Sequence, residues 1–370
     1  MNYLQFEWKQ LIKDKKNIFT IFIIIAYFII CPFIAQYQSS LSLEDVKKEE
    51  LEQVDAMLFI FTTEYIESDT SFKQSYKNLI EQRQLIVQQN LSLKMDQLLL
   101  FVEQELQLIN LQLRLIENSM AGIPSMYQYN VSDLYKDKKV MEYLKENKIP
   151  IRTTLLNNVD VLVRSIEIFI SCILPFITIF YASTIFLDNI YNPSIINSIP
   201  INKRKRLFVK YSVYIGVLIL TSIIGAIAGW AICGFFLEKG NYFYPKVIFN
   251  GEMFSVLSTL NYLVRLSIGA ILLSLLLISL SILLNHFLKH AYANIILLVL
   301  LLLAPVIARE LEDSILIKFV YFFNWLNTVQ GEDAYLFGLA LTYGKGVLTL
   351  IGLVVFFLLC IFLSAKEKGV

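Results

Sequence analysis

Charged residues, glycine, proline, histidine and cysteine are all scarce in this sequence of 370 residues. Only 17% of the residues are charged whereas 56% are hydrophobic, which is too apolar for the surface of a water-soluble protein. Fourteen glycines and eight prolines leave little room for a loop-rich β architecture. The net charge of +1 argues neither for nor against a nucleic-acid partner, and we expect none. The sequence therefore predicts an all-α integral membrane protein embedded in a lipid bilayer.

The residues that support catalysis or metal binding are also few. The cysteines all fall inside predicted spans, where we interpret them as apolar fillers: Cys31, Cys172, Cys233 and Cys360. His286 and His290 are one helical turn apart, but no carboxylate or thiol lies near them in the sequence, so we predict no metal site. Residues 338–346 lack the Ser or Thr that a phosphate loop places after Lys345. We therefore expect no catalytic residue and no cofactor in this chain.

Six apolar stretches are long enough for a helix to cross a hydrocarbon core of about 30 Å. They predict transmembrane helices at 18–37, 164–187, 207–237, 265–288, 291–308 and 346–365. An even number of crossings places both termini on one side, and the clusters of Lys and Arg that flank the spans predict that this side is the cytoplasm. The other predicted segments are a cytoplasmic interface helix (1–17), an outer helical domain (38–163), a cytoplasmic loop (188–206), an outer loop (238–264), an outer re-entrant or interfacial segment (309–345) and a cytoplasmic tail (366–370).

The predicted outer domain has a helical pattern of its own. Residues 71–119 contain neither Gly nor Pro, and their apolar residues recur mostly at steps of three, four or seven. One unbroken helix there would extend roughly 70 Å, whereas a bend would let it pair with the apolar stripe of residues 43–66. The irregular heptads favour a compact helical domain over a two-stranded coil. A further helix is predicted over Val131–Glu146, with Pro150 beyond its end.

Residues 2–16 predict an amphipathic helix that lies in the plane of the lipid headgroups. Leu4, Trp8, Leu11 and Ile12 recur at helical spacing, and lysines occupy other positions of the helical wheel. The alternative interpretation is a charged flank that only sets the orientation of the first span.

This order of segments resembles the membrane subunit of ABC-2 type exporters. The opening residues Phe6, Glu7, Trp8 and Lys9, followed by Lys- and Leu-rich turns, are similar to the N-terminal interface helix of that family. The run Ser-Ile-Pro-Ile-Asn-Lys-Arg-Lys from Ser198 to Lys205 is similar to the family's cytoplasmic stretch before the third span. Residues 314–329 match the position of its re-entrant helices. The resemblance in topology covers nearly the whole chain.

The resemblance implies partners and roles for particular residues. It implies a cytoplasmic ATPase subunit, which binds ATP and Mg²⁺, and a second permease subunit. The residues that it assigns to ATPase coupling are Asp188, Asn192, Pro193, Ser198, Pro200, Asn202, Lys203, Arg204 and Arg206. The residues of the second and fifth spans that it makes candidates for lining the pathway are Phe169, Phe176, Phe180 and Asn294.

The favoured function is therefore that of a permease subunit moving an amphipathic or hydrophobic substrate outward, an antimicrobial or signalling peptide being one candidate. The alternative is a mechanotransmitter or sensor that does not transport and uses its outer helical domain. A secondary carrier is disfavoured because the spans hold almost no charged residues. The abundance of Ile, Lys and Asn is typical of an AT-rich bacterial gene, and we expect a plasma-membrane location.

Overall fold

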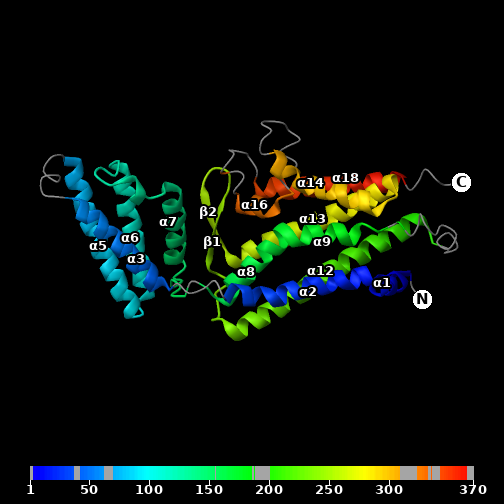
Figure 1. The fold of residues 1–370 in the computed structure, drawn as a ribbon, viewed down its shortest axis with the longest axis horizontal. Helices are drawn as coiled ribbons and strands as arrows, with labels where there is room; N and C mark the ends of the chain where they lie inside the picture. Colours follow the sequence, from blue (N-terminus) through cyan, green and yellow to red (C-terminus); the bar gives the residue numbers. More distant parts are fainter. Residues whose placement is uncertain are drawn as a thin grey trace.

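A computed structural model describes residues 3–36, 42–61, 70–154, 156–185, 187, 201–308, 323–331, 335 and 342–364. The molecule is elongated, with a bundle of helices at one end and long parallel or antiparallel helices over the rest of its length (Figure 1). The first described helix, α1 (Tyr3–Lys13), and the end of α18 (Tyr343–Ser364) both lie at the end opposite the bundle (Figure 1).

Five helical stretches in the described part are long and apolar enough to cross a membrane. The first two are formed by α2 (Lys15–Gln36) and by α8 (Asn158–Ile168), η2 (Phe169–Ile173) and α9 (Leu174–Ala182) in succession. The others are α12 (Lys203–Phe236), α13 (Thr259–Leu288) and α18 (Tyr343–Ser364). The predicted span at 291–308 corresponds to a shorter apolar helix, α14 (Ala291–Ala308). The chain is thus an α-helical, multi-pass membrane protein.

Two spans begin six residues earlier than the sequence predicts, because polar side chains cap them there. Asn157 accepts hydrogen bonds from the backbone N–H groups of Val159 and Asp160, so α8 starts at Asn158 rather than at residue 164. Ser258 likewise accepts from the N–H of Asn261, and α13 starts at Thr259 rather than at residue 265.

The segment expected to be an outer loop contains an antiparallel hairpin, which departs from the all-α prediction. Its strands are β1 (Pro245–Phe249) and β2 (Phe254–Ser258), with Val247 opposite Val256. Each strand has only five residues, so its alternation of polar and apolar residues is too short to predict a strand beside the aromatic residues that precede it.

The bundle consists of α3 (Leu43–Ile60), α5 (Thr70–Lys94) and α6 (Leu98–Glu117), followed by η1 (Ser125–Tyr127) and α7 (Val131–Glu146). Of the two alternatives for residues 71–119, the bend is found and the unbroken helix is not, because the chain reverses between α5 and α6, where Asp96 adopts a φ of 56°. The reversal lets the two apolar stripes bury each other around a core with α3: Val54, Leu79, Ile86, Leu108 and Leu115 are all fully buried. The prediction for α7 is confirmed.

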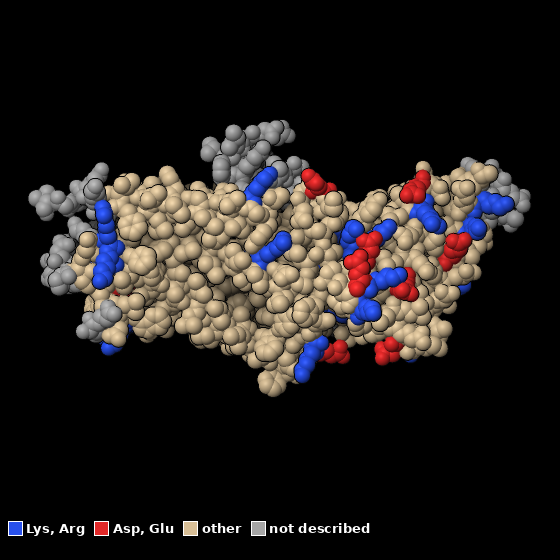
Figure 2. Space-filling view, turned by 180° about the vertical axis from the view of Figure 1, so that it is seen from behind, with Lys and Arg blue, Asp and Glu red and all other residues tan. Residues whose placement is uncertain are grey.

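The long helices pack most closely where α12 meets α2. Gly225 and Gly229, one turn apart on α12, lie against Phe28 of α2, and a Cβ on Gly229 would come within 2.6 Å of the Phe28 carbonyl oxygen. Small residues at this spacing let two membrane helices approach closely. On the face shown in Figure 2, the part formed by the long helices is mostly uncharged, basic side chains lie at the end farthest from the bundle, and side chains of both signs lie over the bundle.

Candidate functional site

The helix α1 (Tyr3–Lys13) packs against α12 with its acidic residue inward. Glu7 and Leu11 are 5% and 2% exposed, whereas Phe6, Trp8 and Lys9 are exposed. The hydroxyl of Tyr3 donates a hydrogen bond to Glu7. Burial, together with the neighbouring carboxylate, raises the pKa of Tyr3, and the charge of Arg206 on α12 opposes that rise. The helix therefore packs on α12 through its Glu7 and Leu11 side and presents an apolar and basic surface outward.

The start of α12 divides its basic residues between two environments. Asn202 caps the helix by accepting from the backbone N–H of Arg204 at 3.1 Å. Arg204 is exposed, but Arg206 is only 6% exposed and lies near enough to α1 for its charge to act on Tyr3. Lys203 opens the helix, and its side chain lies outside the described part of the chain. The remaining predicted coupling residues also lie outside the described residues: Asp188, Asn192, Pro193, Ser198 and Pro200.

The end of α9 is fixed to its neighbours just before the predicted coupling loop. Lys16 donates from Nζ to the Oγ of Ser183 at 3.1 Å and to the Oγ1 of Thr184 at 2.8 Å. From α13, the buried amide of Asn285 donates to the carbonyl oxygens of Ser183 and Ile185. The chain that leads into the loop is thus tied to α2 and α13.

The structure does not gather the predicted pathway-lining residues at one place. Phe169 is 3% exposed and packs with Tyr27 and Phe28. Phe176 and Phe180 are 45% and 44% exposed. Asn294 is fully buried, and its amide donates to the Oγ of Ser281 at 2.8 Å and the Oδ1 of Asn285 at 2.9 Å. Asn294 therefore fastens α14 to α13.

An apolar cavity of about 260 Å³ lies among four of the spanning segments. Its lining comes from α2, from α8, η2 and α9, from α12 and from α13: Phe28, Ile166, Phe169, Ile170, Leu174, Leu218, Ile219, Ser222, Ile223, Ala226, Ser267, Ala270, Ile271 and Ser274. The π-helical turn η2, in which the N–H of Leu174 bonds to the carbonyl of Phe169, forms part of this wall. Pro175 follows it and lacks an N–H, which explains why the regular helix is interrupted there.

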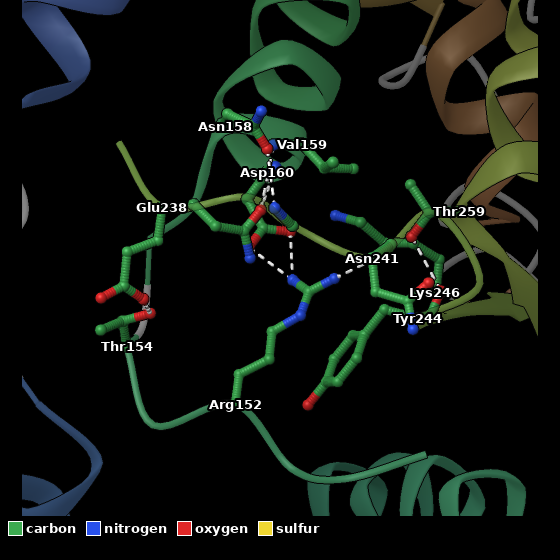
Figure 3. A network of polar contacts seen from close by, with 12 residues as sticks. Arg152, Thr154, Asn158, Val159, Asp160, Glu238, Asn241, Tyr244, Lys246 and Thr259 are labelled. Atoms are coloured by element: carbon green, nitrogen blue, oxygen red, sulfur yellow. Dashed lines mark hydrogen bonds and ion pairs between the residues drawn. The ribbon is translucent and has the colours of Figure 1, made fainter. Parts of the chain in front are cut away.

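A polar joint connects the bundle to the spans (Figure 3). Arg152 donates to both carboxylate oxygens of Asp160, at 2.6 Å for Oδ1, and its guanidinium carbon lies 3.5 Å from the ring centroid of Tyr244. Burial raises the pKa of Tyr244, and the positive charge of Arg152 opposes that shift. Thr154 donates to Glu238 at 3.0 Å, so the chain leaving the bundle is tied to both α8 and the end of α12.

We expect Arg152→Ala to loosen this joint. The side chain of Asp160 is only 22% exposed, and without the guanidinium its carboxylate loses a charge-assisted pair, at a cost of about 2 kcal/mol. Hydrogen exchange of the backbone amides in 154–160 and in the β1–β2 hairpin should become faster. Arg152→Lys should recover only part of the protection, because Lys lacks the planar fork. Unchanged exchange in Arg152→Ala would show that the ion pair does not hold the joint.

Sequence reasoning missed the joint and the cavity. The sequence does hold one signal for the joint. Asp160 follows Asn157 by three residues and precedes an apolar run, and this pattern is typical of a helix N-terminus. The cavity has no such signal, because its residues are ordinary apolar and small residues of four separate helices. In the described ranges, no group of three or more His, Cys, Asp or Glu side chains is placed to hold a metal ion.

Comparison of the chain with family models, with curated proteins and with solved structures finds no match. Function is therefore inferred from the residues and geometry of this chain.

Proposed function

We propose that this chain is the permease subunit of an ATP-driven exporter of the ABC-2 type. It would move an amphipathic or hydrophobic substrate out of the cell, a peptide being one candidate, with energy from a separate cytoplasmic ATPase that binds ATP and Mg²⁺. Since one such chain provides only half of a pathway, it would pair with a second permease subunit. The plasma membrane of a bacterium is the proposed location.

The observation that carries this proposal is the arrangement at the end of the molecule that holds the termini. There α1 is docked on the base of α12 through its buried Glu7 side, and the surrounding basic residues stay exposed. The exposed set is Lys9, Lys13, Lys15, Arg204 and Lys205. A cluster of this kind suits both the cytoplasmic side of a bilayer and an acidic surface on a motor subunit.

The length of α12 provides a route by which force from a motor reaches the cavity. This helix of 34 residues, about 51 Å at 1.5 Å per residue, begins at the basic cluster and ends beside the joint. It packs along α2 on one side and contributes Leu218, Ser222 and Ala226 to the cavity wall on the other. A push on the segment before α12 would tilt the helix and change the shape of the cavity, which is how a motor could bias two arrangements of the permease.

Charge reversal at the start of α12 tests the proposal. In Lys203→Glu/Arg204→Glu, two attractive contacts with an acidic partner become repulsive, so affinity for the ATPase encoded beside this chain should fall about tenfold or more. Co-purification of the two proteins, and ATP-dependent export in vesicles, measure the effect. The matched control is Lys48→Glu/Lys77→Glu in the bundle, at the other end of the molecule, which should leave both unchanged because these side chains are 66% and 80% exposed. Intact assembly and export after reversal at α12 would overturn the role of this segment.

The mechanotransmitter remains the second candidate, and one observation favours it. Helix α7 of the bundle packs on both strands of the hairpin, which is continuous with the start of α13, so movement of the spans can reach the bundle without a transported substrate. A complex that hydrolyses ATP and changes proteolysis of the bundle, but moves no substrate in sealed vesicles, would support this function over export.

A further inference from the structure

The apolar cavity is closed on one side and open on the other. Its floor is formed by Phe169, Ile170 and Leu174, which are 3%, 3% and 4% exposed. Its rim is formed by Ile223 of α12 and Ile271 of α13, which are 50% and 38% exposed. All of these residues lie within stretches long and apolar enough to span a membrane. The mouth between α12 and α13 therefore opens toward the hydrocarbon region of the bilayer.

The polar groups in the wall already have hydrogen-bond partners within the protein, so they need none from a ligand. The lining contains no charged residue, and its three serines each donate to a carbonyl oxygen of their own helix. Ser222 bonds to Leu218, Ser267 to Leu263 and Ser274 to Ala270, at 2.9, 2.8 and 2.8 Å. Apolar cavities of about 150 Å³ in proteins stay dry and accept hydrocarbons. A cavity of about 260 Å³ with this wall should exclude water and bind hydrocarbon.

The π-helical turn gives the cavity its floor. In a regular α-helix, residues five apart point in well-separated directions, whereas the wider π turn brings them closer together. Phe169 and Leu174, five residues apart across η2, both line the cavity. A local departure from the α-helix thus serves to shape an apolar surface below a mouth that faces the bilayer.

We propose that this cavity binds one acyl chain of a bilayer phospholipid, which enters laterally between α12 and α13. The apolar wall, the satisfied serines, the depth of the site within the spans and the one-sided mouth all fit a linear hydrocarbon chain. The headgroup of the lipid stays outside the cavity. The inference does not depend on the export proposal, because it concerns binding by this chain alone.

Photolabelling tests the proposal on the full chain without any ATPase. The protein is placed in vesicles of phosphatidylethanolamine and phosphatidylglycerol that contain a small fraction of phospholipid with a diazirine in its acyl chain. After irradiation, labelled positions are mapped by mass spectrometry. We expect label on Ile170 and Leu174, which bulk lipid cannot reach from outside, in addition to label on the exposed Leu348 of α18.

A matched pair of variants on α12 separates the cavity from the outer surface. Ser222→Phe places a ring inside the cavity and should lower labelling of Ile170 and Leu174 at least fivefold. Ile227→Phe changes a side chain that is 58% exposed and should leave that labelling unchanged. If Ser222→Phe does not fold, Ala226→Leu fills the same space with a smaller change.

Three results would overturn the proposal. In the first, the floor residues stay unlabelled while Leu348 is labelled. In the second, labelling of the floor survives both filling variants. In the third, copies that carry Ile223→Cys and Ile271→Cys form disulfide crosslinks efficiently with no label on the floor, which would show that a second chain covers the mouth instead of lipid.

Discussion

Gly269→Ala should destabilise the membrane part of this protein by about 3–5 kcal/mol, the cost of losing a buried Trp from its site. A Cβ at residue 269 of α13 would lie only 1.6 Å from the ring of Trp325 in α16 (Trp325–Gln330). That ring is 1% exposed and donates from Nε1 to the carbonyl oxygen of Arg265 at 3.3 Å, so it has nowhere to move without leaving its pocket. Thermal unfolding of the purified chain in detergent should shift down by on the order of 10 °C.

Gly352→Ala is the matched control, since nothing lies within 4 Å of a Cβ at that position of α18. This substitution should be neutral or slightly stabilising, because Ala is favoured over Gly inside a helix by about 1 kcal/mol. Equal melting temperatures for Gly269→Ala and Gly352→Ala would show that Trp325 does not occupy the surface of α13.

Lys47→Met should destabilise the helical bundle by about 3–5 kcal/mol, because it leaves two partly buried carboxylates without their shared cation. The Nζ of Lys47 lies 2.6 Å from both Glu50 and Glu105, and its side chain is 4% exposed. Burial alone would lower the pKa of Lys47, but the two carboxylates outweigh burial and hold that pKa above its ordinary value. Methionine keeps the volume and removes the charge. Circular dichroism of the full chain on heating measures the loss.

The effect of Lys47→Met should also depend on pH in a defined direction. Burial already raises the pKa of the Glu105 carboxyl in the folded protein, and the charge of Lys47 opposes that rise, so removing the lysine should raise this pKa further. A carboxyl whose pKa is raised in the folded state stabilises the fold at low pH, and this stabilisation is lost as the pH rises. The variant should therefore approach wild-type stability near pH 4 and deviate most at neutral pH.

Lys48→Met serves as the control for Lys47→Met, because the side chain of Lys48 is 66% exposed and lies 4.0 Å from Asp45. A surface pair of this kind contributes little, so a change within about 0.5 kcal/mol is expected at every pH. A pH-independent loss in Lys47→Met would contradict the electrostatic explanation and indicate a packing defect instead.

A periodic pattern predicts that residues 3–13 form a helix, but it does not predict which face of that helix is buried. The alternation of apolar and basic residues predicts a helix, and α1 is found there. The pattern does not say which face packs, and the buried side carries Glu7 with Leu11, while Leu4, Trp8 and Ile12 remain exposed. The buried face is the one that packs on α12, which lies far away in the sequence.

The sequence by itself determined five of the six predicted spans and the helical character of the bundle. These features depend on hydropathy and on contacts within one helical turn, which a linear pattern records directly. Only the tertiary structure decided that Gly269 accommodates Trp325, that Lys47 joins two carboxylates, that Asn294 fastens two helices, and that four segments leave an apolar cavity. Each of these depends on which faces of distant helices meet, and residue type alone does not encode that choice.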